Sequence, residues 1–170
     1  SVRAGNVIGG GDWSDNRIVP DAIRAFSKGK TLILRSPHAT RPWQHVLEPL
    51  SGYLHLGGTL LENRIIKSEG WNFGPSPEEV RSVLDVAKGL QGLMGQGRIK
   101  IEKQNGSLHE AGLLKLNCDK ANALLGWRPR WNFENTLEKT ASWYKFYLKN
   151  KNLNQIYDQQ ITEYFEGSND

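Results

Sequence analysis

The chain has 170 residues, a length that fits one ordinary domain and makes two full domains unexpected. Its single cysteine, Cys118, excludes a disulfide framework and a cysteine-based zinc site, and no apolar run approaches the roughly 20 residues that span a bilayer. The 22 Lys and Arg residues outnumber the 18 Asp and Glu residues and give a net charge of +4, but they form no basic stripe, so we expect no nucleic-acid partner.

The first half of the chain alternates between strand-like and helix-like segments. The helix at 17–28 is indicated by Pro20 in its first turn and by Gly29 beyond its end. The helix at 45–61 has an expected apolar face that includes Leu50, Leu54 and Leu61. The full set of expected elements is a strand at 2–8, a glycine loop at 9–13, the helix at 17–28, a strand at 31–35, a proline-bounded loop at 37–42 and the helix at 45–61.

The second half is dominated by helices. Ser76 to Glu79 has the pattern of a capping box with Pro77 at the first helical position, and it predicts a helix that runs to Met94. The other expected elements are strands at 71–74 and 98–102, a loop at 105–112, and helices at 117–125, from Asn132 to about 148, and at 153–165. The strands are too few and short to close a sheet of normal size. We therefore expect a helix-rich α/β fold whose main sheet lies elsewhere.

Two arginines and two asparagines are the strongest candidates for ligand contact. Arg17 and Arg41 stand beside loops, and guanidinium groups bind diphosphate oxygens through paired hydrogen bonds, although a lone arginine is more often an ordinary surface residue. Asn6 and Asn72 lie in or after strand-like runs, where an amide binds a ligand or satisfies loop backbone. The glycine run at 9–11 is either a tight turn or a loop that lets backbone approach a ligand.

The histidines and one short motif carry less information. None of the histidines has metal-site spacing, so each is interpreted first as a packed or surface residue: His38, His45, His55 and His109. His109 stands beside Glu110 in a polar loop, where it is also placed to meet a substrate. Tyr147 and Lys151 match Tyr-x-x-x-Lys, a proton-transfer pair in some dehydrogenases, but they stand near the C-terminus without a nucleotide-binding strand before them, and we interpret the match as chance.

Four segments carry a resemblance to a known family: 3–13, 36–53, 71–75 and 124–131. Over about residues 1–150, the chain resembles the CDP-glucose 4,6-dehydratases, which are extended short-chain dehydrogenase/reductases. The most specific block is Arg-Pro-Trp-Gln-His-Val-Leu-Glu-Pro at 41–49. The resemblance implies that residues 1–150 are the C-terminal nucleotide-sugar-binding portion of an enzyme about twice as long, with the strands near 2–8 and 71–74 in its Rossmann sheet. Residues 151–170 are expected to form a helical tail.

The resemblance also implies roles for individual residues. Asn6 resembles the residue beside the nicotinamide of NAD. The residues implied to bind the nucleotide sugar are Gly5, Arg17, Ile18, Ile33, Leu34, Arg35, Arg41, Asn72 and His109. In the family, the dinucleotide fingerprint, the catalytic Tyr-x-x-x-Lys and the acids of the elimination precede the segment that this chain resembles. We therefore expect no catalytic residue in this chain and no activity of the chain alone.

The implied reaction converts CDP-glucose to CDP-4-keto-6-deoxyglucose. Hydride leaves C4 for NAD, water is lost across C5 and C6, and the hydride returns to C6. The resemblance further implies a CDP-sugar as partner, a homodimer or higher oligomer, a cytoplasmic enzyme of deoxysugar and O-antigen synthesis, and no membrane or metal. Two alternatives stay open, namely a non-catalytic nucleotide-sugar-binding module and a related dehydratase or epimerase that uses another nucleotide sugar.

Overall fold

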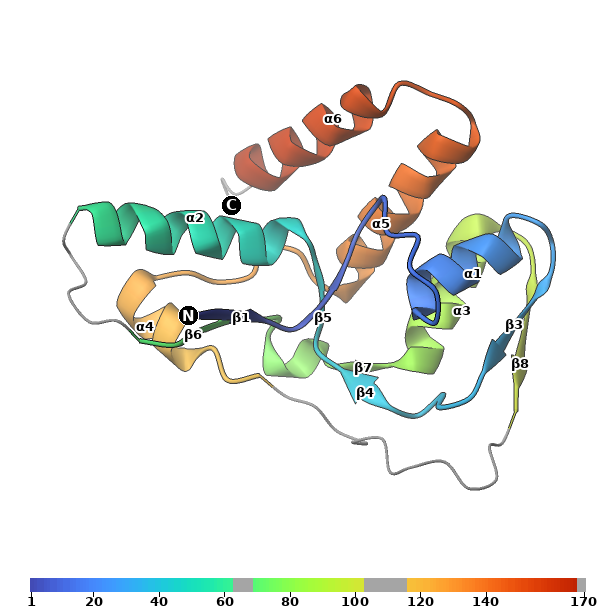
Figure 1. Ribbon diagram of the computed structural model, residues 1–170, viewed down its shortest axis with the longest axis horizontal. Coiled ribbons are helices and arrows are strands. Elements are labelled where there is room, and N and C mark those ends of the chain that lie inside the picture. Colours follow the sequence, from blue (N-terminus) through green and yellow to red (C-terminus); the bar gives the residue numbers. More distant parts are fainter. Residues whose placement is uncertain (63–68, 103–115, 168–170) are drawn as a thin grey trace.

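The computed structural model describes residues 1–62, 69–102 and 116–167, and the predicted loop at 105–112 lies outside these ranges. Helices provide most of the ordered structure (Figure 1). The strands are β1 (Val2–Ala4), β2 (Asn6–Ile8), β3 (Thr31–Leu34), β4 (Thr40–Arg41), β5 (Trp43–His45), β6 (Trp71–Phe73), β7 (Arg81–Ser82) and β8 (Arg98–Ile101). The helices are α1 (Ile18–Phe26), α2 (Leu47–Leu61), α3 (Val83–Met94), α4 (Asp119–Leu125), α5 (Phe133–Leu148) and α6 (Leu153–Glu166). None of the helices in the described ranges has the length and apolar composition needed to cross a membrane.

The segment at 2–8 is two strands rather than the single strand that was predicted. β1 pairs in parallel with β6, whereas β2 pairs in parallel with β5. The partner strand changes from β6 to β5 at Gly5. The Gly5 N–H donates to the Phe73 carbonyl at 3.2 Å, whereas the Asn6 N–H donates to the Pro42 carbonyl at 2.8 Å. A Cβ on Gly5 would lie 2.5 Å from the Pro42 oxygen, so this close approach requires glycine.

The helix α3 begins later than the sequence pattern predicts. Residues 77–79 form a single turn of 3-10 helix, and Arg81 then extends to pair antiparallel with Arg41 in the β4–β7 ladder. The capping box is at Ser82, whose side chain accepts a hydrogen bond from the Asp85 N–H while the Asp85 carboxylate accepts one from the Ser82 N–H. The prediction of a helix starting at the Ser76 box was therefore wrong, because long-range pairing with β4 extends the residues that follow it.

The helix α2 buries a different face from the predicted one. Leu54 and Leu61 are 72% and 86% exposed, and the buried side chains include Glu48 and Leu56. Gly52 faces the core, where the Phe73 ring takes the space that a side chain would need. The helix also begins at Leu47 rather than at 45, because the preceding residues belong to β5.

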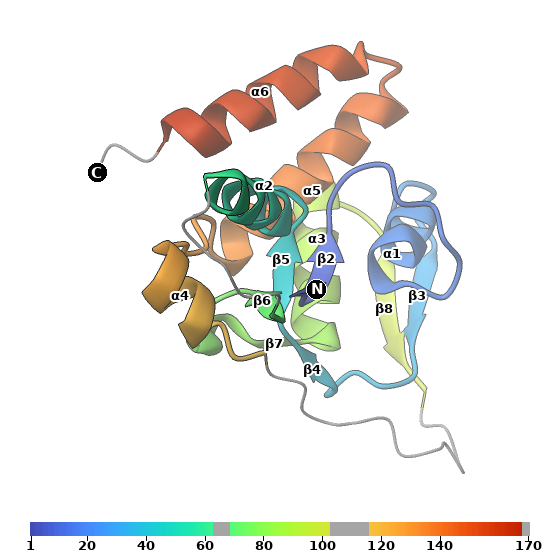
Figure 2. The same cartoon turned by 60° about the vertical axis from the view of Figure 1, so that its left-hand side comes forward.

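Two apolar clusters hold these elements together. The larger cluster joins α1, α3, α5 and the β3–β8 pair, and its fully buried members include Ile23, Phe26, Leu90 and Tyr144. The smaller cluster joins α2, β6 and α4 through Leu56, Trp71, Phe73, Ala121, Leu125 and Trp127. The two views in Figures 1 and 2 show α6 lying across one end of the molecule. The described residues form a set of helices packed around short two-stranded ladders, of which β4–β7 is antiparallel and the others are parallel.

A buried carboxylate ties α6 to the rest of the molecule. Glu48, at the start of α2, accepts hydrogen bonds from the backbone N–H of Trp131 at 2.7 Å and of Arg130 at 3.1 Å. The hydroxyl of Tyr164 in α6 donates to the same carboxylate at 2.7 Å. Burial raises the pKa of Glu48, against the opposing effect of these hydrogen bonds. The three donors explain why a charged side chain is accommodated inside the protein.

His45 is the other titratable group inside this region, and it is 1% exposed. Its Nδ1 accepts a hydrogen bond from the Leu47 N–H at 3.3 Å, so the ring is neutral with its proton on Nε2. Burial, helped by the positive charge of Lys139, lowers the pKa of His45 to about 4. The ring packs edge-on to Trp131 with 4.9 Å between ring centroids, which makes His45 a core residue.

Substitution of Gly52 tests the packing of α2 on β6. An added Cβ would lie 2.2 Å from a ring carbon of the buried Phe73, so we expect Gly52→Ala to lower the free energy of unfolding by about 1–3 kcal/mol through overpacking. Gly58 lies in the same helix, and a Cβ there would meet no atom within 4 Å, so Gly58→Ala is expected to raise the free energy of unfolding by about 0.5–1 kcal/mol. Urea unfolding of both variants measures the difference, and equal effects would contradict this packing.

The pKa of His45 predicts acid sensitivity. The unfolded imidazole has a pKa near 6.5 and the folded one about 4, so the unfolded chain binds the proton first and stability is lost as pH falls from 6.5 toward 4. Between pH 8 and 4.5 we expect His45 to account for roughly 2 to 3 kcal/mol of lost unfolding free energy. His45→Gln should remove this part of the pH dependence, whereas the exposed His55→Gln should not. An unchanged pH profile in His45→Gln would contradict the assignment.

Candidate functional site

A cavity of about 860 Å³ opens between the β1–β2 junction, the start of α1 and the end of β3. Most of the residues that the sequence singled out line it: Gly5, Asn6, Arg17, Ile18, Ile33, Leu34, Arg35 and Arg41. These residues come from four separate segments of the first quarter of the chain. Their convergence on one cavity makes it the candidate ligand site.

Two of the sequence-predicted site residues are not in this group. Asn72 lies in β6, where its amide accepts a hydrogen bond from Arg3 at 3.2 Å and donates to the Asn117 carbonyl at 2.9 Å. It does not line the cavity. His109 lies outside the described residues.

The start of α1 forms one wall of the cavity. Arg17 precedes the helix with an extended backbone and no side-chain cap, and the first N–H groups of a helix have no partner within it. The Arg17 side chain is 65% exposed and lies 3.6 Å from the Asp12 carboxylate. Burial alone would raise the pKa of Asp12, but the Ser14 N–H and the nearby arginines lower it below its ordinary value. This wall therefore combines a guanidinium, an ionised carboxylate and a helix N-terminus.

The helix α5 supports the glycine loop from behind. The hydroxyl of Tyr144 donates to the Asp12 carbonyl at 2.6 Å, and burial is the main cause that raises the pKa of Tyr144 to about 12, so it stays a donor. The Trp143 ring packs so closely on Gly10 that a Cβ there would lie 2.0 Å from it. Trp13 covers Tyr144 edge-on with 5.2 Å between ring centroids. Glycine at position 10 is thus required by a close approach, which decides the alternative that the sequence left open in favour of a packed turn beside the site.

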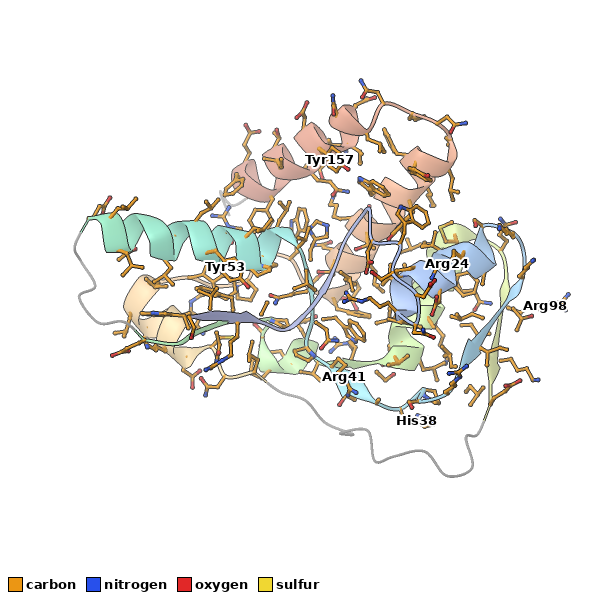
Figure 3. All side chains as sticks on the ribbon, viewed as in Figure 1. Arg24, His38, Arg41, Tyr53, Arg98 and Tyr157 are labelled. Atoms are coloured by element: carbon orange, nitrogen blue, oxygen red, sulfur yellow. The ribbon has the colours of Figure 1, made fainter. Side chains whose placement is uncertain are left out.

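A second wall of the cavity comes from β4, β5 and the start of α3. Arg41 lies in β4, as Figure 3 shows, and its guanidinium donates to the Thr40 carbonyl at 2.8 Å. Trp43 is buried beside it, and its indole N–H donates to the Arg81 carbonyl at 3.0 Å. Val83 completes this side of the cavity. The wall is therefore apolar with one guanidinium at its edge.

Some lining residues were missed by sequence reasoning, among them Asp12, Asn16, Asp21, Ser36, Trp43, Val83 and Glu102. Trp43 belongs to the 41–49 block that carries the family resemblance, so it could have been singled out from the sequence. Glu102 follows β8, far from the other lining residues in the sequence. Its place in an alternating strand predicted a strand residue but not a ligand contact. The Tyr147 and Lys151 pair does not line the cavity, and Tyr147 stacks on Trp143 with 5.6 Å between ring centroids. Within the described ranges, no group of three His, Cys, Asp or Glu side chains is arranged to hold a metal ion.

Comparison with known proteins adds a sequence relative. No family model matches the chain. CDP-glucose 4,6-dehydratase of Salmonella typhimurium is 41% identical over 168 residues, which cover 99% of this chain and 47% of that protein. The chain therefore spans about half the length of the curated relative it matches.

Solved structures match the fold at lower identity. A dTDP-glucose 4,6-dehydratase from Bacillus anthracis in complex with NAD has a TM-score of 0.68 and 21% identity, over 85% of this chain and 43% of that chain. A UDP-glucuronic acid 4-epimerase from Bacillus cereus in complex with UDP-glucuronic acid and NAD has a TM-score of 0.70 and 20% identity. The match covers 85% of this chain and 44% of that chain. The predicted fold class is confirmed. The chain has the helix-rich α/β fold of the C-terminal portion of extended short-chain dehydrogenase/reductase dehydratases and epimerases, and its sequence is similar to CDP-glucose 4,6-dehydratase.

Proposed function

We propose that the cavity binds a CDP-sugar, and that the chain is the substrate-binding part of an NAD-dependent CDP-glucose 4,6-dehydratase. The reaction would convert CDP-glucose to CDP-4-keto-6-deoxyglucose. The observation that carries the proposal is the convergence on one cavity of residues that the family resemblance had singled out from separate segments. The 41% identity to a CDP-glucose 4,6-dehydratase over nearly the whole chain supports the same choice of substrate.

The diphosphate of the substrate would lie at the start of α1. The unpaired N–H groups and the helix dipole favour an anion there, and Arg17 adds a guanidinium that forms paired hydrogen bonds to phosphate oxygens. Arg41, from β4, lines the same cavity. Asp12 holds Arg17 at the cavity mouth before the ligand arrives. Two arginines from separate elements of one cavity suit an elongated anion such as a diphosphate.

Asn6 fits the neighbourhood of a nicotinamide. Its half-buried side chain lines the cavity where β2 begins, and a side-chain amide pairs with a carboxamide as both donor and acceptor. When bound, NAD supplies the hydride acceptor and donor of the reaction. The residues of this chain would bind the nucleotide sugar, keep water from its diphosphate and orient its sugar, which are large contributions to a rate even without a catalytic group.

A nucleotide panel tests the assignment. Calorimetric titration of the intact protein, expressed from its complete gene, should give CDP the lowest dissociation constant among CDP, UDP, GDP and dTDP. CDP-glucose should then be converted to a 4-keto-6-deoxy product by the intact protein and left unchanged by the chain of 170 residues. Equal binding of the four nucleotides would contradict the cytidine assignment and favour a relative acting on another sugar nucleotide. Turnover by the chain alone would show that it carries its own catalytic residues.

Arg17 gives a local test of the diphosphate position. Arg17→Met removes the guanidinium, and we expect it to weaken CDP binding by the intact protein on the order of ten-fold. Arg98→Met is the matched control, because Arg98 lies at the outer edge of β8 and does not line the cavity (Figure 3). The same loss in both variants would mean that overall charge, and not a contact at α1, attracts the nucleotide.

A further inference from the structure

The cavity has two chemically different ends. The end beside α1 offers Arg17 and the helix N-terminus, which suit phosphate. The other end is the β3–β8 ladder, and it contributes Ile33, Arg35 and Glu102 to the lining. If the diphosphate lies at α1, the remaining parts of a nucleotide sugar must extend away from it on both sides. The β3–β8 end combines an apolar side chain with both a carboxylate and a guanidinium, whereas the wall from β4 and β5 offers a guanidinium without a carboxylate.

The ladder fixes how these side chains face. Ile33 is in register with Lys100. The Glu102 N–H donates to the Leu34 carbonyl at 3.0 Å, so the hydrogen bonding between the two strands continues to the residue after β8. Because side chains alternate along a strand, Ile33, Arg35, Lys100 and Glu102 share one face of the ladder. Ile33 is 50% exposed on that face, so about half of its apolar side chain is open to a ligand.

Glu102 differs from the other carboxylates in the cavity. Asp12 interacts with Arg17, and Asp21 accepts a hydrogen bond from Arg24 at 2.7 Å, so both belong to the α1 wall. Glu102 is held by Lys100, whose Nζ lies 2.7 Å from Oε1. The contact orients the carboxylate and engages one of its two oxygens, and a carboxylate has acceptor sites to spare on the other.

We propose, on the basis of the function proposed above, that Glu102 determines the choice of pyrimidine by accepting a hydrogen bond from the exocyclic amino group of cytosine. An ionised carboxylate only accepts hydrogen bonds. Cytosine presents an N4 amino donor where uracil and thymine present an O4 acceptor, so the same carboxylate attracts one base and repels the others. The half-exposed Ile33 provides the surface on which the face of the ring packs. Arg35 lies two residues after Ile33 and on the same face, and its guanidinium provides a donor for the acceptor atoms of cytosine.

The test is a selectivity measurement on the intact protein. Wild-type protein should bind CDP on the order of ten-fold or more tightly than UDP, as expected for one hydrogen bond to a charged group set against one repulsive contact. Glu102→Gln keeps the size of the side chain and supplies both a donor and an acceptor. It should weaken CDP binding, strengthen UDP binding and reduce the CDP-to-UDP preference about ten-fold.

Controls separate this inference from the function on which it rests. Glu138→Gln removes an exposed carboxylate on α5 that does not line the cavity, and it should leave the preference unchanged. Wild-type protein that binds none of the nucleotides would refute the proposed function. Wild-type protein that prefers CDP, with the same preference in Glu102→Gln, would refute only the role of Glu102. Tighter binding of GDP than of CDP would also overturn it, because the carboxylate would then be reading a purine.

Discussion

The geometry of the cavity depends on the contact between the glycine loop and α5. The Trp143 ring occupies the space beside Gly10, and the buried Tyr144 hydroxyl holds the Asp12 carbonyl. These two contacts connect residues more than a hundred positions apart in the chain and fix where the loop turns toward α1. Arg17 follows that turn directly, so its position at the cavity mouth is a consequence of packing at the far side of the loop.

The helix α5 is itself held at its first turn by carboxylates from other elements. Glu48 from α2 accepts hydrogen bonds from the two N–H groups just before Asn132, and Glu79 from the 3-10 turn accepts one from the Phe133 N–H at 2.8 Å. The Asn132 side chain caps the Asn135 N–H. Since the first turn of a helix exposes unpaired donors, negative groups there are stabilising. The buried Glu48 is thus explained by the need to anchor the helix on which the glycine loop rests.

Sequence reasoning was most successful where the signal is local. Pro20 and Gly29 correctly bracketed α1, and Asn132 was correctly expected to cap α5. It failed where a distant partner decides the outcome. The β4–β7 ladder has only two residues per strand and no periodicity to detect, yet it displaced the start of α3 from the Ser76 box. Likewise, the contact of Gly52 with Phe73 and the donors around Glu48 determine which face of α2 is buried. The spacing of the leucines in α2 therefore predicted the wrong face.

The same distinction applies to the site. Arginines beside loops could be found from charge and position alone, because guanidinium chemistry narrows their use. Glu102 could not be found, because its relevance depends on a parallel pairing between strands more than sixty residues apart. The pairing places both a carboxylate and a guanidinium, those of Glu102 and Arg35, at the end of the cavity away from α1. At α1, Asp12 already neutralises part of the charge of Arg17. A phosphate bound at α1 would compete with Asp12 for Arg17 and would not reach the β3–β8 end. Under the proposed function, a ligand that joins a diphosphate to a base with an amino group would use both ends at once, and we therefore expect the cavity to bind a whole nucleotide more tightly than either of its parts.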